Sequence, residues 1–257
     1  MVKPLLKKYV GSLWRREKAC VFVAPGSIEL LRGRGKTPAT ISVRLSEPAQ
    51  WDSVCKGVAD LVRDNLPAGS AVGLVLSNHW VRYLTLPAGR GRLGREVETE
   101  LARSMLTEQF GAGWEDAIVC VEDGVADEGV LAAAIRRDLA ESLRTALGTG
   151  SYEVQWIAPL FSHLFDQACS RMKGPSAMVA CLEPGRVVLG MVGPDGWRWV
   201  RSPIAAENPV STLERELARE CALLASDATV PLYLLARGTA MPDRIDGVPG
   251  ISLHSLH

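Results

Sequence analysis

The chain uses the same order of elements twice, and this repetition limits its possible folds more than any other feature of the sequence. Short apolar runs separated by turn residues predict three antiparallel strands at the start and three more after residue 176. The six segments are Ala19–Ala24, Ile28–Arg32, Thr40–Leu45, Ala177–Leu182, Arg186–Val192 and Trp197–Arg201. Each set is followed by a helix and a further strand. We therefore expect an α/β protein with two lobes, each with a mixed sheet, in which topology rather than residue identity is repeated.

The first lobe continues with a helix and two strands. The helix is predicted to begin at Ser46, a favourable N-cap, and it carries apolar side chains at helical spacing from Trp51 to Val62. The strands are predicted at Ala71–Leu76 and Val81–Leu86.

A segment of different character follows, from Gly89 to Gly150. Its pattern predicts a charged helix, a hairpin and a second helix, so we expect a helix–hairpin–helix subdomain inserted at about residues 89–150. The Lys173-Gly174-Pro175 stretch is the best candidate boundary between lobes. The expected organisation is an arm at 1–18, a first lobe at 19–173 with the insert, and a shortened second lobe at 174–257.

Residues 1–18 contain six lysines and arginines around a loosely helical apolar stripe. One interpretation is a solvated helix or strand lead-in that packs on the body. The alternative is a weak contact with an anionic membrane surface or an acidic partner. The longest charge-free stretch, from Asn65 to Val81, is interrupted by proline and glycine and is too short for a membrane span. No secretory signal pattern is present, so we expect a cytoplasmic protein.

The composition excludes several classes of function. With 29 Lys+Arg against 29 Asp+Glu, the chain lacks the positive charge typical of nucleic-acid binding. The six cysteines are far apart and without metal-ligand spacing, so we interpret them as reduced core thiols. Glu183 is interpreted as a solvated turn carboxylate rather than as a metal ligand. The acidic residues Glu122, Asp123, Asp127 and Glu128 are interpreted as a solvated hairpin tip, with a contact to a basic partner as the alternative.

One segment carries a specific family resemblance. The two-lobe layout is similar to that of the actin-like, ribonuclease-H-like superfamily. Within it, the twelve residues Leu76–Pro87, LSNHWVRYLTLP, resemble a segment of the PilM-type proteins of type IV pilus assembly and of the cytoplasmic domain of the type II secretion protein L. In those families a Ser-x-x-x-Val-Arg-Tyr strand that ends in Leu-Pro precedes an inserted subdomain. The likeness covers about residues 19–257, although only the twelve-residue segment is specific.

The resemblance also identifies what this chain lacks. Active members of the superfamily carry Asp-x-Gly at the first hairpin, where one carboxylate holds a hydrated metal beside the nucleotide phosphates. The equivalent residues here are Ala24-Pro25-Gly26, and the second phosphate loop is Glu183-Pro184-Gly185. Proline has no N–H to donate to a phosphate in either turn. The nearest match to an adenosine loop, Ala236-Arg237-Gly238-Thr239, has a single glycine. We therefore expect no nucleotide, metal or other cofactor.

Two classes of function follow from the resemblance. The first is a non-catalytic scaffold of a type IV pilus or type II secretion assembly, held at the inner membrane by the cytoplasmic tail of a single-span protein, with an assembly ATPase as a further candidate partner. Its candidate partner-binding residues are Trp80, Arg82 and Leu84. We expect Arg82 to pair with a carboxylate of the insert or to rim a groove. The second class is an actin-like ATPase or small-molecule kinase with an unrecognised phosphate site. A ribonuclease-H-type nuclease needs several convergent carboxylates, and the opening strands contain only Glu29.

Overall fold

The computed structural model describes most of the chain. The described residues are 19–32, 39–45, 50–89, 93–123, 128–206, 208–224, 230–245 and 251–255. The basic arm at 1–18 and the predicted helix start at Ser46 lie outside the described residues. Among the described residues, no helix has the length and apolar character needed to cross a membrane.

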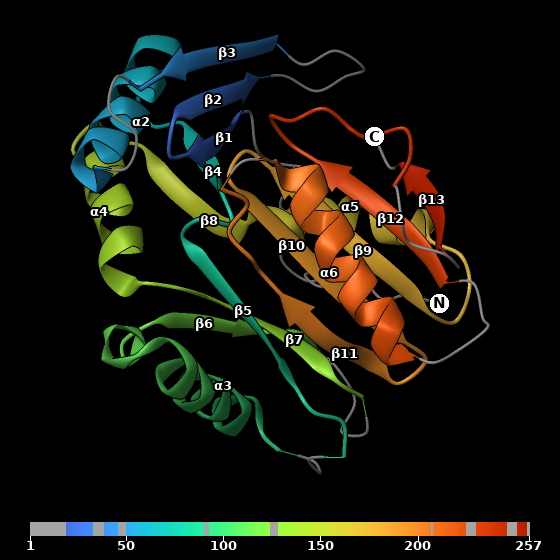
Figure 1. Cartoon of the computed structure of the whole chain (residues 1–257). Helices are drawn as coiled ribbons and strands as arrows, with labels where there is room; N and C mark the ends of the chain where they lie inside the picture. Colours follow the sequence, from blue (N-terminus) through green and yellow to red (C-terminus); the bar gives the residue numbers. More distant parts are fainter. Residues whose placement is uncertain are drawn as a thin grey trace.

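The first lobe is built on a five-stranded mixed sheet in the order β3-β2-β1-β4-β8 (Figure 1). Its strands are β1 (Ala19–Ala24), β2 (Ser27–Arg32), β3 (Ala39–Arg44), β4 (Ala71–Leu76) and β8 (Glu153–Pro159). The first three strands are antiparallel, and β1, β4 and β8 run parallel to one another. Helix α2 (Trp51–Asn65) packs on β1 and β2 through an apolar face that includes Val54, Val58 and Leu61.

The second lobe repeats this topology strand for strand. Its sheet has the order β11-β10-β9-β12-β13, with the same antiparallel and parallel pairings. The strands are β9 (Ala177–Glu183), β10 (Arg186–Gly193), β11 (Gly196–Arg201), β12 (Val230–Ala236) and β13 (Ile251–Ser255). Helix α6 (Pro209–Leu224) lies in front of this sheet in Figure 1, and α5 (Leu160–Ala168) lies behind it. The predicted duplication of two α/β lobes is confirmed.

The insert does not contain the same secondary-structure elements as the predicted helix–hairpin–helix unit. Its hairpin, β6 (Ile118–Val121) and β7 (Val130–Ile135), takes β5 (Val81–Leu86) as a third strand in the order β5-β7-β6. Strand β5 therefore belongs to this three-stranded sheet and not to the five-stranded sheet of the first lobe. Helix α3 (Arg95–Phe110) covers the three-stranded sheet. Helix α4 (Arg137–Gly148), which we expected in the insert, instead packs against α2 and β8 of the first lobe. Its buried leucines, Leu143 and Leu147, belong to the main core.

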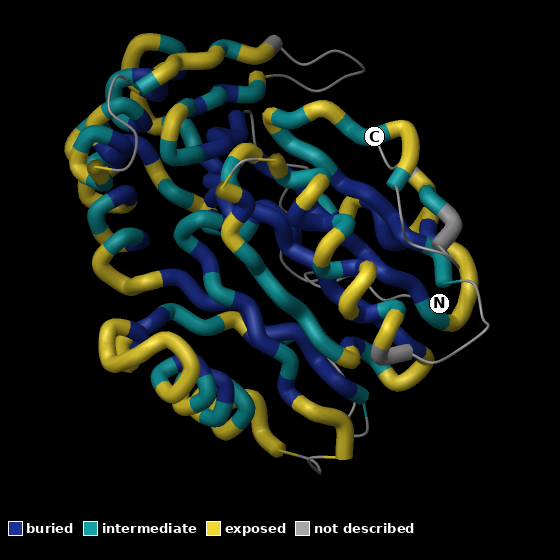
Figure 2. The backbone as a smooth tube through the Cα atoms, in the orientation of Figure 1, coloured by how far each residue is buried: buried dark blue, intermediate teal, exposed yellow. Residues whose placement is uncertain are grey.

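Burial follows this arrangement (Figure 2). One large core runs through the first lobe and across α5 to the second lobe, and two smaller cores lie under α3 and under α6. Strand β5 separates two of these cores, because Val81 and Tyr83 face the main core whereas Leu84 and Leu86 face α3. Successive side chains of β5 therefore alternate between the two cores. This alternation places Arg82 on the α3 side.

Candidate functional site

The turn after β4 joins the three parts of the molecule. Ser77 and Asn78 follow the apolar strand directly, and both are completely buried. The side-chain oxygen of Asn78 accepts hydrogen bonds from the Tyr83 hydroxyl at 2.6 Å and from the Phe161 backbone N–H at 3.1 Å. Its amide group donates to the Cys181 sulfur at 3.6 Å. One asparagine therefore connects β4, β5, α5 and the second lobe, and its burial is possible because these groups satisfy it.

The carboxylate of Glu183 meets this turn from the second lobe. The Ser77 hydroxyl donates to one carboxylate oxygen at 2.7 Å, and the Asn78 backbone N–H donates to the other at 2.8 Å. Burial raises the pKa of Glu183 to about 7, against the effect of these hydrogen bonds. The interpretation of Glu183 as a solvated turn carboxylate is wrong, because the side chain is only 2% exposed. The first lobe covers the hairpin on which Glu183 lies.

Two further contacts cross between the lobes beside the hairpin turns. The His79 ring nitrogen Nε2 lies 2.9 Å from the backbone oxygen of Pro184, and burial lowers the pKa of this histidine. Arg237, at the end of β12, forms an ion pair with Glu29 of β2 and lies 4.9 Å from the centroid of the Phe22 ring. Direct protein contacts therefore connect the two hairpins where the resemblance places the phosphate loops.

The three candidate partner-binding residues have different environments. Trp80 is half-buried and meets Trp51 of α2 edge to face, with ring centroids 4.9 Å apart. Arg82 is also half-buried, and its guanidinium lies 5.3 Å from the Trp114 ring centroid and 5.6 Å from that of Phe110. The expected carboxylate partner is therefore replaced by two aromatic faces of the insert. Leu84 is buried in the core under α3, so its assignment to a partner surface is wrong.

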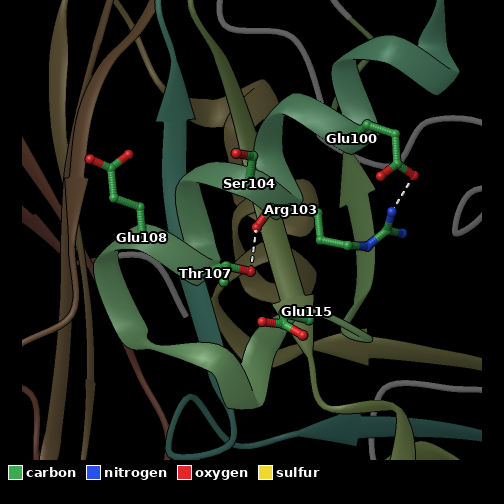
Figure 3. Close-up of a pocket in the computed structure, with 6 residues that line it drawn as sticks. All are labelled: Glu100, Arg103, Ser104, Thr107, Glu108 and Glu115. Carbon is green, nitrogen blue, oxygen red and sulfur yellow. Dashed lines mark hydrogen bonds and ion pairs between the residues drawn. The ribbon is translucent and has the colours of Figure 1, made fainter.

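The described residues also include a hollow of about 460 Å³ on the outer side of α3 (Figure 3). Its lining residues are Glu100, Arg103, Ser104, Thr107, Glu108 and Glu115. Arg103 pairs with Glu100 on the same helix, as the dashed line in Figure 3 shows. The hollow is acidic and solvated. No buried polar group lines it, and it has no feature of a catalytic site.

The remaining cysteine, histidine and carboxylate side chains are dispersed over the described part of the chain. It contains no group of three or more His, Cys, Asp or Glu side chains that could hold a metal ion. Its six cysteines are free thiols, of which Cys20, Cys55, Cys169 and Cys181 are buried. In the acidic hairpin, Asp127 lies outside the described residues, and Asp123 is exposed and pairs with Arg95.

Glu122 does not fit the solvated hairpin tip that we expected. It is half-buried, and burial raises its pKa to about 8. One of its carboxylate oxygens accepts a hydrogen bond from the Leu131 backbone N–H at 3.3 Å. The acidic residues of this hairpin therefore have separate environments rather than a shared solvated one.

Comparisons with known proteins give the fold. No protein-family model matches the sequence, and no curated protein matches it. The cytoplasmic domain of EpsL, an inner membrane component of the type II secretion system of Vibrio cholerae, superimposes with a TM-score of 0.53 at 11% identity, over 93% of this chain and 90% of that one. A PilM–PilN type IV pilus biogenesis complex matches with a TM-score of 0.58 at 15% identity, over 94% of this chain and 88% of that one.

A Bacteroides thetaiotaomicron protein of actin-like ATPase fold and unknown function matches with a TM-score of 0.54 at 10% identity, over 86% and 83% of the two chains. The chain therefore has an actin-like fold. The predicted fold class is confirmed.

Sequence analysis missed the residues that form the centre of the lobe junction. The sequence did not indicate the role of Asn78, and it predicted that Glu183 is exposed to solvent. A local signal existed for the turn, because two polar residues, Ser77 and Asn78, directly follow an apolar strand. Their partner Glu183 is 106 residues away from Ser77, and no local pattern records that contact.

Proposed function

We propose that the protein is a non-catalytic, actin-like scaffold of a pilus or secretion assembly, and that it binds the cytoplasmic tail of a single-span inner-membrane protein. The observation that carries the proposal is the burial of Glu183 against Ser77 and Asn78. In an active relative, the turn on which Glu183 lies would face a nucleotide phosphate. In this chain the turn is held by the opposite lobe, and proline removes an N–H donor from each hairpin.

The similar structures support the choice of partner. One is an inner membrane component of a type II secretion system, and another is a complex of PilM with PilN. Fold alone does not determine function, so the proposal needs a surface on this chain. Trp80 is half-buried against Trp51, and Arg82, two residues further along, is half-buried over Phe110 of the insert; we propose that these side chains supply that surface. Such residues are enriched where proteins bind peptides.

Recruitment to liposomes tests this proposal. The probe is a synthetic peptide with the sequence of the cytoplasmic tail of a single-span protein encoded beside this gene, displayed on liposomes. We expect the protein to float with these liposomes and to remain largely unbound to bare anionic ones. Trp80→Ala should weaken recruitment at least tenfold, whereas Val97→Ala, at a 54% exposed position on α3, should leave it unchanged. Equal recruitment of both variants would contradict the proposed binding surface. Equally strong binding to bare liposomes and to tail-bearing ones would contradict recruitment by the tail.

A further inference from the structure

Two arginines from different lobes lie near His79, and their positive charges lower its pKa in addition to the larger effect of burial. Arg82 of β5 donates from Nη1 to the backbone oxygens of His79 and Val81, at 3.3 and 3.0 Å. The other side of the ring faces the second lobe, where a Cβ built on Gly185 would lie 3.0 Å from the ring carbon Cε1. Arg186 follows Gly185 directly at the start of β10. The chain thus brings two guanidinium groups, 104 positions apart in sequence, to one place at the lobe junction.

Positive charge is in excess at this place. Among the described residues, neither guanidinium forms an ion pair, and both oxygens of the nearby Glu183 carboxylate accept hydrogen bonds from the first lobe. Burial lowers the pKa of Arg186 and the positive charge of Arg82 lowers it further, whereas the nearby carboxylate of Glu183 raises it. Burial likewise lowers the pKa of Arg82. Two positive charges repel each other more strongly where little water surrounds them. An anion bound between the two guanidinium groups would reduce this repulsion.

Two donors at the same position lack hydrogen-bond partners. Arg186 is 8% exposed, and its Nη1 donates to the backbone oxygen of Ser202 at 3.0 Å. Its Nε is buried without a partner, and so is the hydroxyl of Ser202. Buried donors are seldom left unsatisfied in a folded protein, so each such group needs an explanation. Ile204, two residues after Ser202, forms an isolated β-bridge with Arg186 and is 68% exposed. The buried donors of Arg186 and Ser202 therefore lie close to the protein surface.

We propose that Arg82, Arg186 and Ser202 form an acceptor site for one carboxylate, supplied by an acidic side chain of the partner tail. The proposal rests on the proposed function and adds a specificity-determining contact to it. A guanidinium presents parallel N–H groups that match the two oxygens of a carboxylate. Phosphate fits less well, because Pro184, two residues before Arg186, has no N–H to donate, and the adjacent Glu183 disfavours a doubly charged ligand more than a singly charged one.

Nuclear magnetic resonance tests the site directly, because a buried arginine Nε–H gives a resolved signal. The probe is N-acetylglutamate N-methylamide, titrated at constant ionic strength, with the N-acetylglutamine analogue as the neutral match and inorganic phosphate as a second anion. We expect the Arg186 Nε–H resonance to shift in a saturable way with the glutamate probe and not with the glutamine probe. Equal shifts with both probes, or tighter binding of phosphate, would overturn the carboxylate assignment.

Variants then connect the site to the partner tail. Arg186→Gln and Arg82→Gln should each weaken binding of the glutamate probe and recruitment to tail-bearing liposomes at least tenfold. Arg103→Gln is the control for loss of an arginine on α3. Arg186→Lys keeps the charge but lacks the Nε donor, so it should bind the probe more weakly than the wild-type protein. If Arg186→Gln folds and is recruited normally, the inference is wrong while the scaffold proposal stands. If the wild-type protein binds the probe but no tail, the scaffold proposal fails instead.

Discussion

Ser77 of the first lobe donates its hydroxyl hydrogen to the carboxylate of Glu183 in the second lobe, with 2.7 Å between the two oxygens. Both residues are buried, at 0% and 2% exposure. An ionised carboxylate in such a place loses much of its hydration, and two hydrogen bonds replace only part of it. The protonation state of Glu183 therefore contributes to the stability of the junction, beside the other contacts between the lobes.

Replacement of Glu183 by glutamine should change how stability depends on pH. The pKa of Glu183 is raised from 4.5 to about 7 in the folded protein, so folding favours the protonated form. Its stabilising effect is full below pH 4.5 and is lost as the pH rises through about 7. Glutamine stays neutral and keeps an oxygen for the Asn78 N–H. Relative to wild type, Glu183→Gln should gain about 2 to 3 kcal/mol of unfolding free energy between pH 5 and pH 8.

Urea unfolding at several pH values measures this difference. The control for the loss of one carboxylate is Glu108→Gln, because Glu108 is exposed on α3. A constant difference between Glu183→Gln and the wild-type protein across this pH range would contradict the raised pKa of Glu183.

We also expect that neither ATP nor ADP binds, with or without magnesium. Pro25 and Pro184 lack the N–H groups that would contact phosphates, and the first hairpin has Ala24 where the resemblance implies a metal-binding aspartate. In addition, the ion pair between Arg237 and Glu29 connects the two lobes beside these turns. Calorimetry with nucleotide up to millimolar concentration is the measurement. A micromolar dissociation constant would support the alternative of an actin-like ATPase or small-molecule kinase.

Local patterns predicted most strands because their signals are local. The bounds of β4 and β5 agree with the sequence prediction to the residue, since each is an apolar run between turn residues. The sheet to which β5 belongs was not predictable in this way. Its pairing with β7, in which Val81 lies opposite Ile135, depends on contacts about fifty residues apart. Helix α4 shows the same limit, because an apolar stripe does not specify which surface will cover it.

The candidate site was less predictable than the fold. A glutamate beside Pro-Gly in a hairpin turn is normally exposed. The sequence around Glu183 does not show that the other lobe covers this turn. The same reason applies to Arg82. Strand alternation puts it on the face shared with Leu84, but its partners Phe110 and Trp114 come from the end of α3 and the short helical turn beyond it. Only the folded chain brings these rings to the arginine.

Removal of the Arg82 guanidinium should destabilise the insert. It is held by two backbone oxygens and lies over the Phe110 and Trp114 rings. We expect Arg82→Ala to lower the unfolding free energy by about 1 to 2 kcal/mol. Arg103→Ala, which removes an ion pair with the exposed Glu100, should change it by no more than about 0.5 kcal/mol. Thermal and urea unfolding compare the two variants. An unchanged stability of Arg82→Ala, together with unchanged tail binding, would exclude both a structural and a partner-binding role.

The contact between the insert and the second lobe should depend on Gly129. Its backbone N–H donates to the backbone oxygen of Asp195 at 2.7 Å, and its backbone oxygen accepts from the backbone N–H of Trp197 at 2.8 Å. A Cβ on Gly129 would lie 2.0 Å from the backbone oxygen of Trp197, so the two segments could not approach this closely. We expect Gly129→Ala to cost more than about 2 kcal/mol, because backbone must move and two hydrogen bonds weaken. The matched control is Gly148→Ala at the end of α4, where an added Cβ meets nothing within 4 Å and alanine favours the helix. Faster hydrogen exchange at the Trp197 backbone N–H in Gly129→Ala, but not in Gly148→Ala, would show that stability is lost at the contact between the insert and the second lobe. Equal stability of the two variants would show that this contact tolerates a side chain at residue 129.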